Sequence, residues 1–175
     1  MPNFDDFKLA IEAMTGGKNT VLFDDMGMPS VMVPFPKMKI AEIMSGGSQN
    51  IHPAFSAGGV EKDVLYVSKF QNIVLNDRAY SLPMRDPKVY VTFDQAMTFC
   101  NKGKGWSLNP YSLWSAIALW CKKNGTMPRG NNFWGKDYTY QHEKGVPCAW
   151  ESKESESHPG EPARCLTGSG PATWY

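Results

Sequence analysis

Apolar and polar residues recur along the chain with periods that predict a mixture of helices and strands. Near the N-terminus the spacing is helical, with apolar positions at Phe4, Phe7, Ile11 and Met14. Residues 4–14 are therefore predicted to form a short helix that ends at Gly16 and Gly17. We expect this helix to pack on its own domain. The alternative is a contact between copies of the chain, because a short apolar seam at a terminus commonly serves that purpose.

Short runs of β-branched and aromatic residues predict several strands before residue 83. The predicted strands are Thr20–Phe23, Ser30–Val33, Lys37–Ile43, Val64–Phe70 and Asn72–Asn76. Pro34 and Pro36 interrupt this pattern, which places their region at a sheet edge or a bulge, because proline donates no backbone hydrogen bond. Ala79–Pro83 is expected to lead out of the sheet.

Two helices joined by a glycine-rich turn are predicted between Val91 and Asn124. In the first helix Asp94 is expected to cap the helix or to lie in its first turn. The apolar positions of this helix are Ala96, Met97, Phe99 and Cys100. In the second helix Asn109 is the expected N-cap and Pro110 the first helical residue. Its apolar stripe, typical of a helix laid against a sheet, consists of Leu113, Trp114, Ile117, Ala118 and Cys121.

Composition and charge narrow the class of protein. The 175 residues suit one domain, and 42% hydrophobic with 20% charged residues is ordinary for a soluble globular protein. A net charge of +1 argues against a nucleic-acid-binding surface. No secretory signal opens the chain, and no apolar stretch reaches the roughly 20 residues that span a bilayer. We therefore expect no nucleic-acid partner and no membrane insertion.

The cysteines and histidines show no catalytic or metal-binding pattern. The cysteine spacings match no zinc motif. Cys100 and Cys121 are expected to be buried free thiols, and a disulfide between Cys148 and Cys165 is left open. The three histidines are interpreted as surface or loop residues: His52, His142 and His158.

Two pairs of adjacent acidic residues and one loop contain oxygen atoms that could contact a substrate or a metal ion. Asp5–Asp6 and Asp24–Asp25 are interpreted as solvated turn charges, because neighbouring residues in a strand point to opposite faces and cannot share a substrate. Asn131, Asn132 and Asp137 carry oxygens that suit calcium, but their spacing matches no calcium-binding loop, so no metal is expected.

The loop that follows the second helix has two interpretations. In the structural one, Arg129 orders the loop and Trp134 fills the core. In the functional one, aromatic and amide side chains form a binding face for a sugar or a protein, because tyrosine and tryptophan offer contact area at low entropic cost. The candidate ligand-binding residues are Asn131, Asn132, Trp134, Tyr138 and Tyr140. The candidate structural residues are Trp106, Trp114, Arg129 and Gly130.

Several segments together resemble a known family. Ser30–Pro36, Asp94–Cys100 and Trp106–Ala118 resemble the formylglycine-generating, sulfatase-modifying family of C-type-lectin-like folds. A closer resemblance, to the phage and prophage branch of that superfamily, is carried by Gly105–Leu108, Trp114–Cys121, Asn124–Asn132 and Leu166–Tyr175. That branch includes receptor-binding proteins of the major-tropism-determinant type, which diversity-generating retroelements vary.

The resemblance covers residues 28–175 and implies a fold. The expected class is α+β, a C-type-lectin-like domain in which two helices pack on short, twisted antiparallel strands with long loops. Residues 1–19 would form the N-terminal helix and residues 20–175 the lectin-like domain. In the family the fold continues after a segment like Gly170–Tyr175, so the chain is expected to lack the C-terminal part of that fold, either as a fragment or as a shortened relative.

The resemblance also implies a function. We expect a non-catalytic, cofactor-free receptor-binding protein of the phage tail-fibre type, because Cys148 and Cys165 do not match the cysteine motif of the sulfatase-modifying enzymes. Its partner would be a host-cell surface protein or glycan. It would be a homo-oligomer, with a trimer suited to a fibre tip, and would reside in the virion or, as a prophage product, in the bacterial cytoplasm. The alternatives are a sulfatase-modifying oxidase and a structural virion component.

Overall fold

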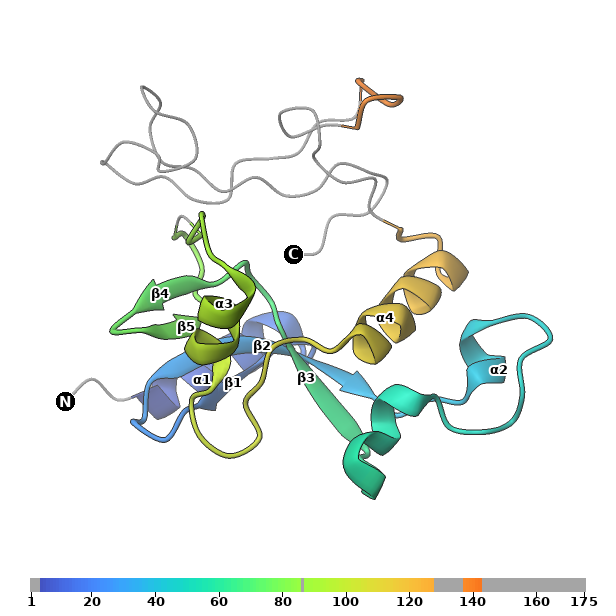
Figure 1. Ribbon diagram of the computed structural model, residues 1–175, viewed down its shortest axis with the longest axis horizontal. Coiled ribbons are helices and arrows are strands. Elements are labelled where there is room, and N and C mark those ends of the chain that lie inside the picture. Colours follow the sequence, from blue (N-terminus) through green and yellow to red (C-terminus); the bar gives the residue numbers. More distant parts are fainter. Residues whose placement is uncertain (1–3, 86, 128–136, 143–175) are drawn as a thin grey trace. The chain divides into compact units, whose positions relative to one another are not determined.

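The computed structural model describes residues 4–85, 87–127 and 137–142, and these fall into two compact units. Unit 1 contains the described residues up to Phe35 together with Tyr66–Leu108. Unit 2 contains Pro36–Leu65 and the described residues from Asn109 onward. Helices and short antiparallel strands occur together, as Figure 1 shows, so the α+β class predicted from the sequence is confirmed.

A three-stranded sheet supplies most of the framework of unit 1. Its strands are β1 (Thr20–Phe23), β2 (Pro29–Pro36) and β3 (Val64–Ser68), in the order β1-β2-β3. β1 and β2 are antiparallel, with Val21 opposite Val31. Both valines are almost completely buried, at 0% and 2% exposure, so the core of this unit begins at the β1–β2 pair.

The two prolines of β2 lie in the central strand, so the prediction of an edge position is wrong. β1 is short and pairs only with Pro29–Met32. Pro34 and Pro36 therefore lie beyond the part of β2 that faces β1. Their missing N–H groups remove no hydrogen bond from the β1–β2 ladder, which explains why a central strand tolerates them.

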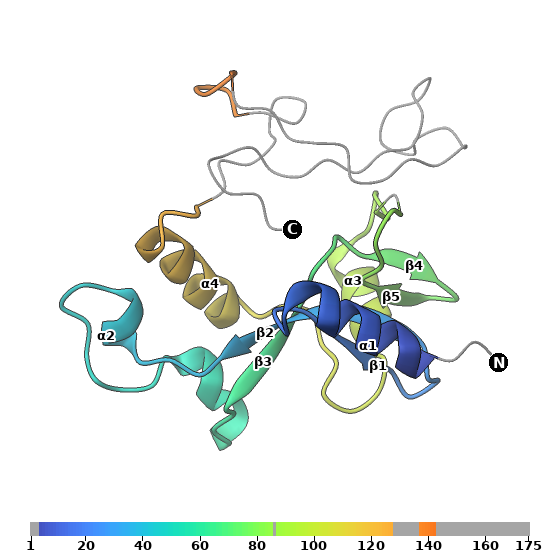
Figure 2. The same ribbon diagram turned by 180° about the vertical axis from the view of Figure 1, so that it is seen from behind.

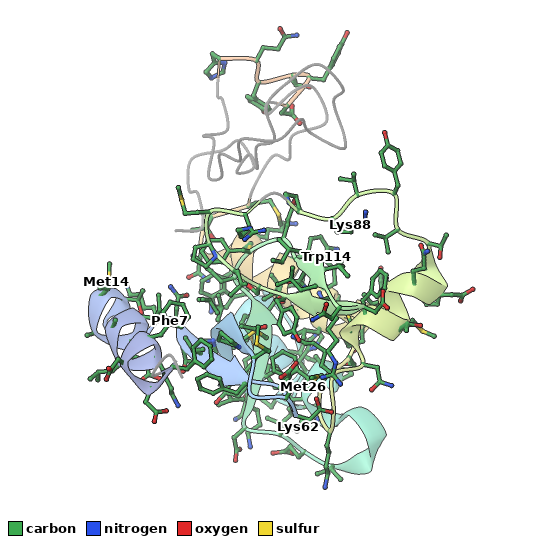
Figure 3. All side chains as sticks on the ribbon, turned by 90° about the vertical axis from the view of Figure 1, so that its left-hand side faces the viewer. Phe7, Met14, Met26, Lys62, Lys88 and Trp114 are labelled. Atoms are coloured by element: carbon green, nitrogen blue, oxygen red, sulfur yellow. The ribbon has the colours of Figure 1, made fainter. Side chains whose placement is uncertain are left out.

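The N-terminal helix is present as predicted and is α1 (Phe4–Thr15). α1 packs along β1, as Figure 2 shows from behind, and the rings of Phe4 and Phe23 lie 6.1 Å apart. Figure 3 shows Phe7 on the side of α1 that faces the strands and Met14 on the outer side. The helix therefore packs on its own unit, as expected.

The last position of the predicted apolar seam does not join this contact. Met14 is 84% exposed, and Leu9 is 66% exposed on the same helix. Thr15 takes the inner position at this end, because its hydroxyl donates to the carbonyl of Ile11 and accepts the backbone N–H of Asn19. The helix thus presents two large apolar side chains outward.

A hairpin and a helix complete unit 1. β4 (Ile73–Leu75) pairs with β5 (Arg78–Tyr80) across a two-residue turn. Both turn residues have positive φ, 48° at Asn76 and 57° at Asp77, as a tight hairpin turn requires. Residues 79 and 80 thus belong to a strand, although the sequence pattern placed them on the way out of the sheet.

Helix α3 (Phe93–Cys100) packs against β5 and begins with a capping box. The Thr92 hydroxyl accepts the N–H of Gln95, and the Gln95 side chain accepts the N–H of Thr92. Asp94 lies in the first turn, one of the two roles expected for it. Met97 was predicted on the apolar face, but it is 49% exposed, because the helix turns Ala96, Phe99 and Cys100 inward instead.

Unit 2 is mainly helical and is built around Phe55, which is 0% exposed. It contains α2 (Ile40–Ile43), the 3-10 helix η1 (Pro53–Gly59) and α4 (Tyr111–Lys123). The predicted strand at residues 37–43 is wrong. Glu42 accepts the backbone N–H of Lys39 and so closes a helical turn there.

Helix α4 differs from its prediction in its first residue and in its packing partners. Pro110 is the N-cap and Tyr111 the first helical residue, one position later than predicted, because the carbonyl of Pro110 accepts the first intrahelical bonds. Gly125 follows the helix in a left-handed conformation, with φ 67°. α4 packs on η1 and α2 within unit 2, whereas a sheet was expected. Its fully buried residues are Leu113, Ala116 and Cys121.

Candidate functional site

Most of the predicted loop site lies outside the described residues. The members that fall there are Arg129, Gly130, Asn131, Asn132 and Trp134. Cys148, Cys165 and His158 lie outside the described residues as well. The described members of the site are Tyr138 and Tyr140.

The short segment of residues 137–142 is organised by Asp137. One carboxylate oxygen of Asp137 accepts the backbone N–H groups of Thr139, at 2.9 Å, and of Tyr140, at 3.3 Å. Tyr138 is 71% exposed, and the Tyr140 ring meets His142 edge-on with 6.3 Å between ring centroids. Asp137, considered above as a calcium ligand, thus acts as a turn former, and the turn presents Tyr138 to solvent.

A pair of aromatic side chains lies on the outer face of α4. Tyr111 is 83% exposed and Trp114 is 59% exposed. Residues three apart are neighbours on a helix surface, so the two rings belong to one patch. Trp114 was predicted in the buried stripe, but α4 is rotated so that Leu113 and Ala116 face inward. That rotation leaves Trp114, one of the two tryptophans of the helix, at the surface.

A second exposed apolar patch lies at the start of α3, in unit 1. Tyr90 is 82% exposed, Phe93 67% and Met97 49%. Phe93 and Met97 are one helical turn apart. Tyr90 has φ 55°, a left-handed conformation that is costly for a bulky side chain.

The centre of unit 1 contains a buried charge cluster around Asp24, where the sequence predicted a solvated turn. The side chain of Asp24 is 0% exposed. One oxygen accepts the N–H groups of Met26 and Met28, at 3.0 and 2.9 Å. The other accepts the Tyr80 hydroxyl at 2.8 Å and the Arg78 guanidinium at 3.2 Å. Asp24 thus ties the turn between β1 and β2 to β5.

Asp24 and Asp25 share one cation, which contradicts the expectation that adjacent acids face apart. Arg78 also bonds the carboxylate of Asp25, which is half exposed. The alternation argument holds for a strand, whereas β1 ends at Phe23 and both acids lie in the following turn. A turn can direct neighbouring side chains to the same partner.

These contacts shift the pKa values of the cluster. Burial alone would raise the pKa of Asp24, but the hydrogen bonds from Met28, Tyr80, Met26 and Arg78 outweigh it and leave that pKa below the ordinary 3.8. Burial and the hydrogen bond to Asp24 raise the pKa of Tyr80 to about 12. The pKa of Arg78 is raised, first by its hydrogen bond to Asp25. Asp24 and Arg78 are therefore charged, and Tyr80 neutral, at neutral pH.

Lys102 is the second buried charge of unit 1, at 2% exposure. Its Nζ donates to the Ser30 hydroxyl at 3.2 Å. It also lies 3.9 Å from the ring centroid of Trp106 and 4.4 Å from that of Tyr80. Burial lowers the pKa of Lys102 from 10.5 to about 8, although the charge of Asp24 opposes the shift. Trp106, which was predicted to be a structural residue, thus packs its ring against the buried Lys102 amine.

Cys100, Cys121 and His52 are buried or half-buried, and burial shifts the pKa of each. Cys121 is buried and Cys100 half-buried, both are free thiols, and burial raises the pKa of each. A raised pKa disfavours the reactive thiolate. His52 was interpreted as a surface or loop residue. It lies outside the helices and strands, immediately before η1, but it is only 7% exposed, and its Nδ1 accepts the N–H of Ala54.

The described part of the chain contains neither a metal-binding cluster nor a membrane-spanning helix. Residues 4–85, 87–127 and 137–142 contain no group of three or more His, Cys, Asp or Glu side chains placed to hold a metal ion. None of the helices in those ranges combines the length and apolar character that a bilayer crossing requires. No protein-family model matches the chain, and no curated protein shows significant similarity to it.

Two structural features that were not predicted, the turn closed by Asp24 and the capping box of α3, nevertheless have local signals in the sequence. Asp24 is followed by Asp25, Met26 and Gly27, a combination typical of a turn that an Asp side chain closes. Thr92 and Gln95 have the spacing of a capping box. The burial of Lys102 has no comparable local signal, because Ser30 on β2 and Tyr80 on β5, two of its three partners, are distant in the sequence.

Proposed function

We propose that the protein recognises a ligand without catalysing a reaction, through the aromatic patch of Tyr111 and Trp114 on α4. The observation that carries this proposal is the exposure of both rings, 83% and 59%, on adjacent positions of one helix face. Clustered exposed aromatic side chains mark interaction sites on soluble proteins. Tyrosine and tryptophan are also enriched among the residues that dominate binding energy.

The chemistry of the described cysteines supports a binding role over the sulfatase-modifying alternative. An oxidase of that kind needs reactive thiols, whereas burial raises the pKa of both Cys100 and Cys121. The resemblance of the chain to phage and prophage receptor-binding proteins suggests the setting. In that setting the protein is a virion component with a C-type-lectin-like fold, and its ligand is a protein or glycan on the host-cell surface.

The test is binding of the fluorescently labelled full chain to a panel of bacterial strains by flow cytometry, alongside an array of bacterial surface glycans. We expect saturable binding to a subset of strains. Trp114→Ala and Tyr111→Ala should each weaken it about tenfold or more, which corresponds to about 1.4 kcal/mol. Met26→Ala is the matched control, because Met26 is a similarly exposed apolar residue, at 69%, in the other unit.

Several outcomes would contradict the proposal. Unchanged binding in both aromatic variants would remove the α4 patch from the site. Weaker binding in Phe93→Ala alone would transfer the site to α3. Formation of an aldehyde on a cysteine-containing sulfatase peptide incubated with the chain and copper would replace the binding role with an enzymatic one.

A further inference from the structure

The loop after α3 is attached to the turn between β1 and β2 by backbone and side-chain contacts. The N–H of Asp25 donates to the carbonyl of Lys102 at 3.4 Å. Gly103 lies so close to Asp25 that a Cβ atom there would come within 3.0 Å of the Asp25 side chain, and its φ of 108° also requires glycine. The loop at residues 101–106 and the turn at residues 24–28 are therefore in direct contact within unit 1.

Lys102 reaches from this loop into the core. Its Nζ is bonded to Ser30 on β2 and enclosed by the rings of Tyr80 on β5 and Trp106 on the loop itself. The Ser30 hydroxyl also accepts the backbone N–H of Ser81 at 3.4 Å. One side chain thus connects the loop to β2 and β5.

The partners of Lys102 stabilise an ammonium group only in part. Within the described residues Lys102 forms no ion pair, because the carboxylates of Asp24 and Asp25 are held by Arg78. An ammonium group offers three donors, and the Ser30 hydroxyl accepts one of them. The two ring faces attract the cation, and burial opposes the charge.

We propose that Lys102 is a proton-controlled latch, which holds the loop at residues 101–106 on the turn at residues 24–28 more firmly when its amine is neutral. The neutral amine still bonds the Ser30 hydroxyl and fills the space between the rings. Burial of the neutral amine also avoids the desolvation cost of a buried ammonium charge. This role is separate from ligand recognition at α4.

The sign of the pH dependence follows from the two protonation states. The amine of the unfolded chain keeps its proton up to its ordinary pKa of 10.5, whereas in the folded protein the pKa of Lys102 is about 8. Between those values the unfolded state binds more protons, so stability rises with pH. Other titrating groups face the amine or lie nearby: Asp24, Arg78, Tyr80 and Cys100. Of these, Cys100 and Tyr80 act in the opposite direction, because the raised pKa of each makes alkali destabilising.

The test compares urea unfolding of the wild-type chain with that of Lys102→Met between pH 7 and pH 11. Taking the ratio of the two unfolding constants cancels the contribution of the groups that do not interact with Lys102, and leaves that of Lys102 and its coupling to Asp24, Arg78 and Cys100. We expect the wild-type constant to fall relative to the variant by about two orders of magnitude across this range. Lys104→Met is the control, because Lys104 is an exposed residue of the same loop, and its ratio should not change with pH.

A second measurement keeps the proposal testable if Lys102→Met does not fold. In the wild-type chain, nuclear magnetic resonance of ¹⁵N-labelled lysine should show one Nζ that titrates near pH 8. The hydrogen-exchange protection of the Asp25 amide, which donates to Lys102, should rise over the same pH range. An Nζ of Lys102 that titrates at pH 10.5 or above, or Asp25 protection that does not follow the titration, would overturn the latch.

Discussion

At the scale of single residues, Asp24 shows how a polar side chain organises a core. Its two oxygens accept four hydrogen bonds, two from the backbone of its own turn and two from side chains of β5. A fully buried carboxylate without such partners would be strongly destabilising. With these four hydrogen bonds, Asp24 holds the β1–β2 turn in place. The same turn contacts the loop that carries Lys102.

This arrangement predicts a loss of stability in acid. The pKa of folded Asp24 lies below its unfolded value of 3.8, so its stabilising contribution is complete above that value. The contribution should disappear as the pH falls below 3.8 and through the folded pKa. Asp24→Asn should cost about 2–3 kcal/mol at pH 7 and should flatten the pH dependence between pH 5 and pH 2. Urea unfolding across that range measures both effects.

Asp25→Asn is the matched control for this prediction. Asp25 shares Arg78 with Asp24, but its side chain is 50% exposed, so solvent screens its ion pair. We expect a change within about 1 kcal/mol. Equal losses of unfolding free energy in the two variants would show that the buried position of Asp24 does not increase its contribution to stability.

At the scale of elements, the helices are specified largely by their ends. α3 is only 8 residues long, which is too short to be stable alone, so its capping box and its packing on β5 must hold it. α4 ends where Lys122 and Lys123 complement the negative end of the helix dipole and Gly125 reverses the chain.

The cap of α3 supports a quantitative prediction. Thr92→Ala removes the acceptor of the Gln95 N–H and should destabilise unit 1 by about 1 kcal/mol. Thr98→Ala, on the same helix, removes only a bond to the carbonyl of Asp94 and should change stability by less than about 0.5 kcal/mol. Thermal or urea unfolding of the two variants provides the comparison. A larger loss in Thr98→Ala would contradict this account of the helix.

At the scale of the whole molecule, the exposed side chains of α1 bear on assembly. The inner side of α1 packs on β1, and the expected self-association must therefore use its outer side, where Leu9 and Met14 are 66% and 84% exposed. Large apolar side chains at the surface favour association when a second copy can cover them. The trimer suggested by the resemblance remains a prediction.

Light scattering of the purified chain tests this prediction. We expect a mass of three chains for the wild type and of one chain for the double variant Leu9→Glu and Met14→Glu, because burying the new charges would be costly. Met26→Glu is the control, since Met26 is 69% exposed in a turn away from α1. A monomeric wild type would exclude α1 as an assembly element.

Local patterns in the sequence predicted α1, α3, α4 and most of the strands, but neither α2 nor η1. The spacing at residues 4–14, the β-branched runs at β1, β3 and β4, and Gly125 are readable because the signal and the structure it predicts lie in the same few residues. The α+β class follows from these elements. The exposed position of Tyr138 agrees with the functional one of the two interpretations of its loop.

Tertiary structure decided which side of each element faces inward and which distant residues meet. Trp114 lies at the surface because α4 packs on η1 and α2, a choice that the helical period alone leaves open among neighbouring positions. Asp24 and Lys102 are buried because partners more than 50 positions away, Arg78 for the first and Ser30 for the second, satisfy them. Long-range contacts of this kind have no local sequence signal, and they determine the candidate site and the latch.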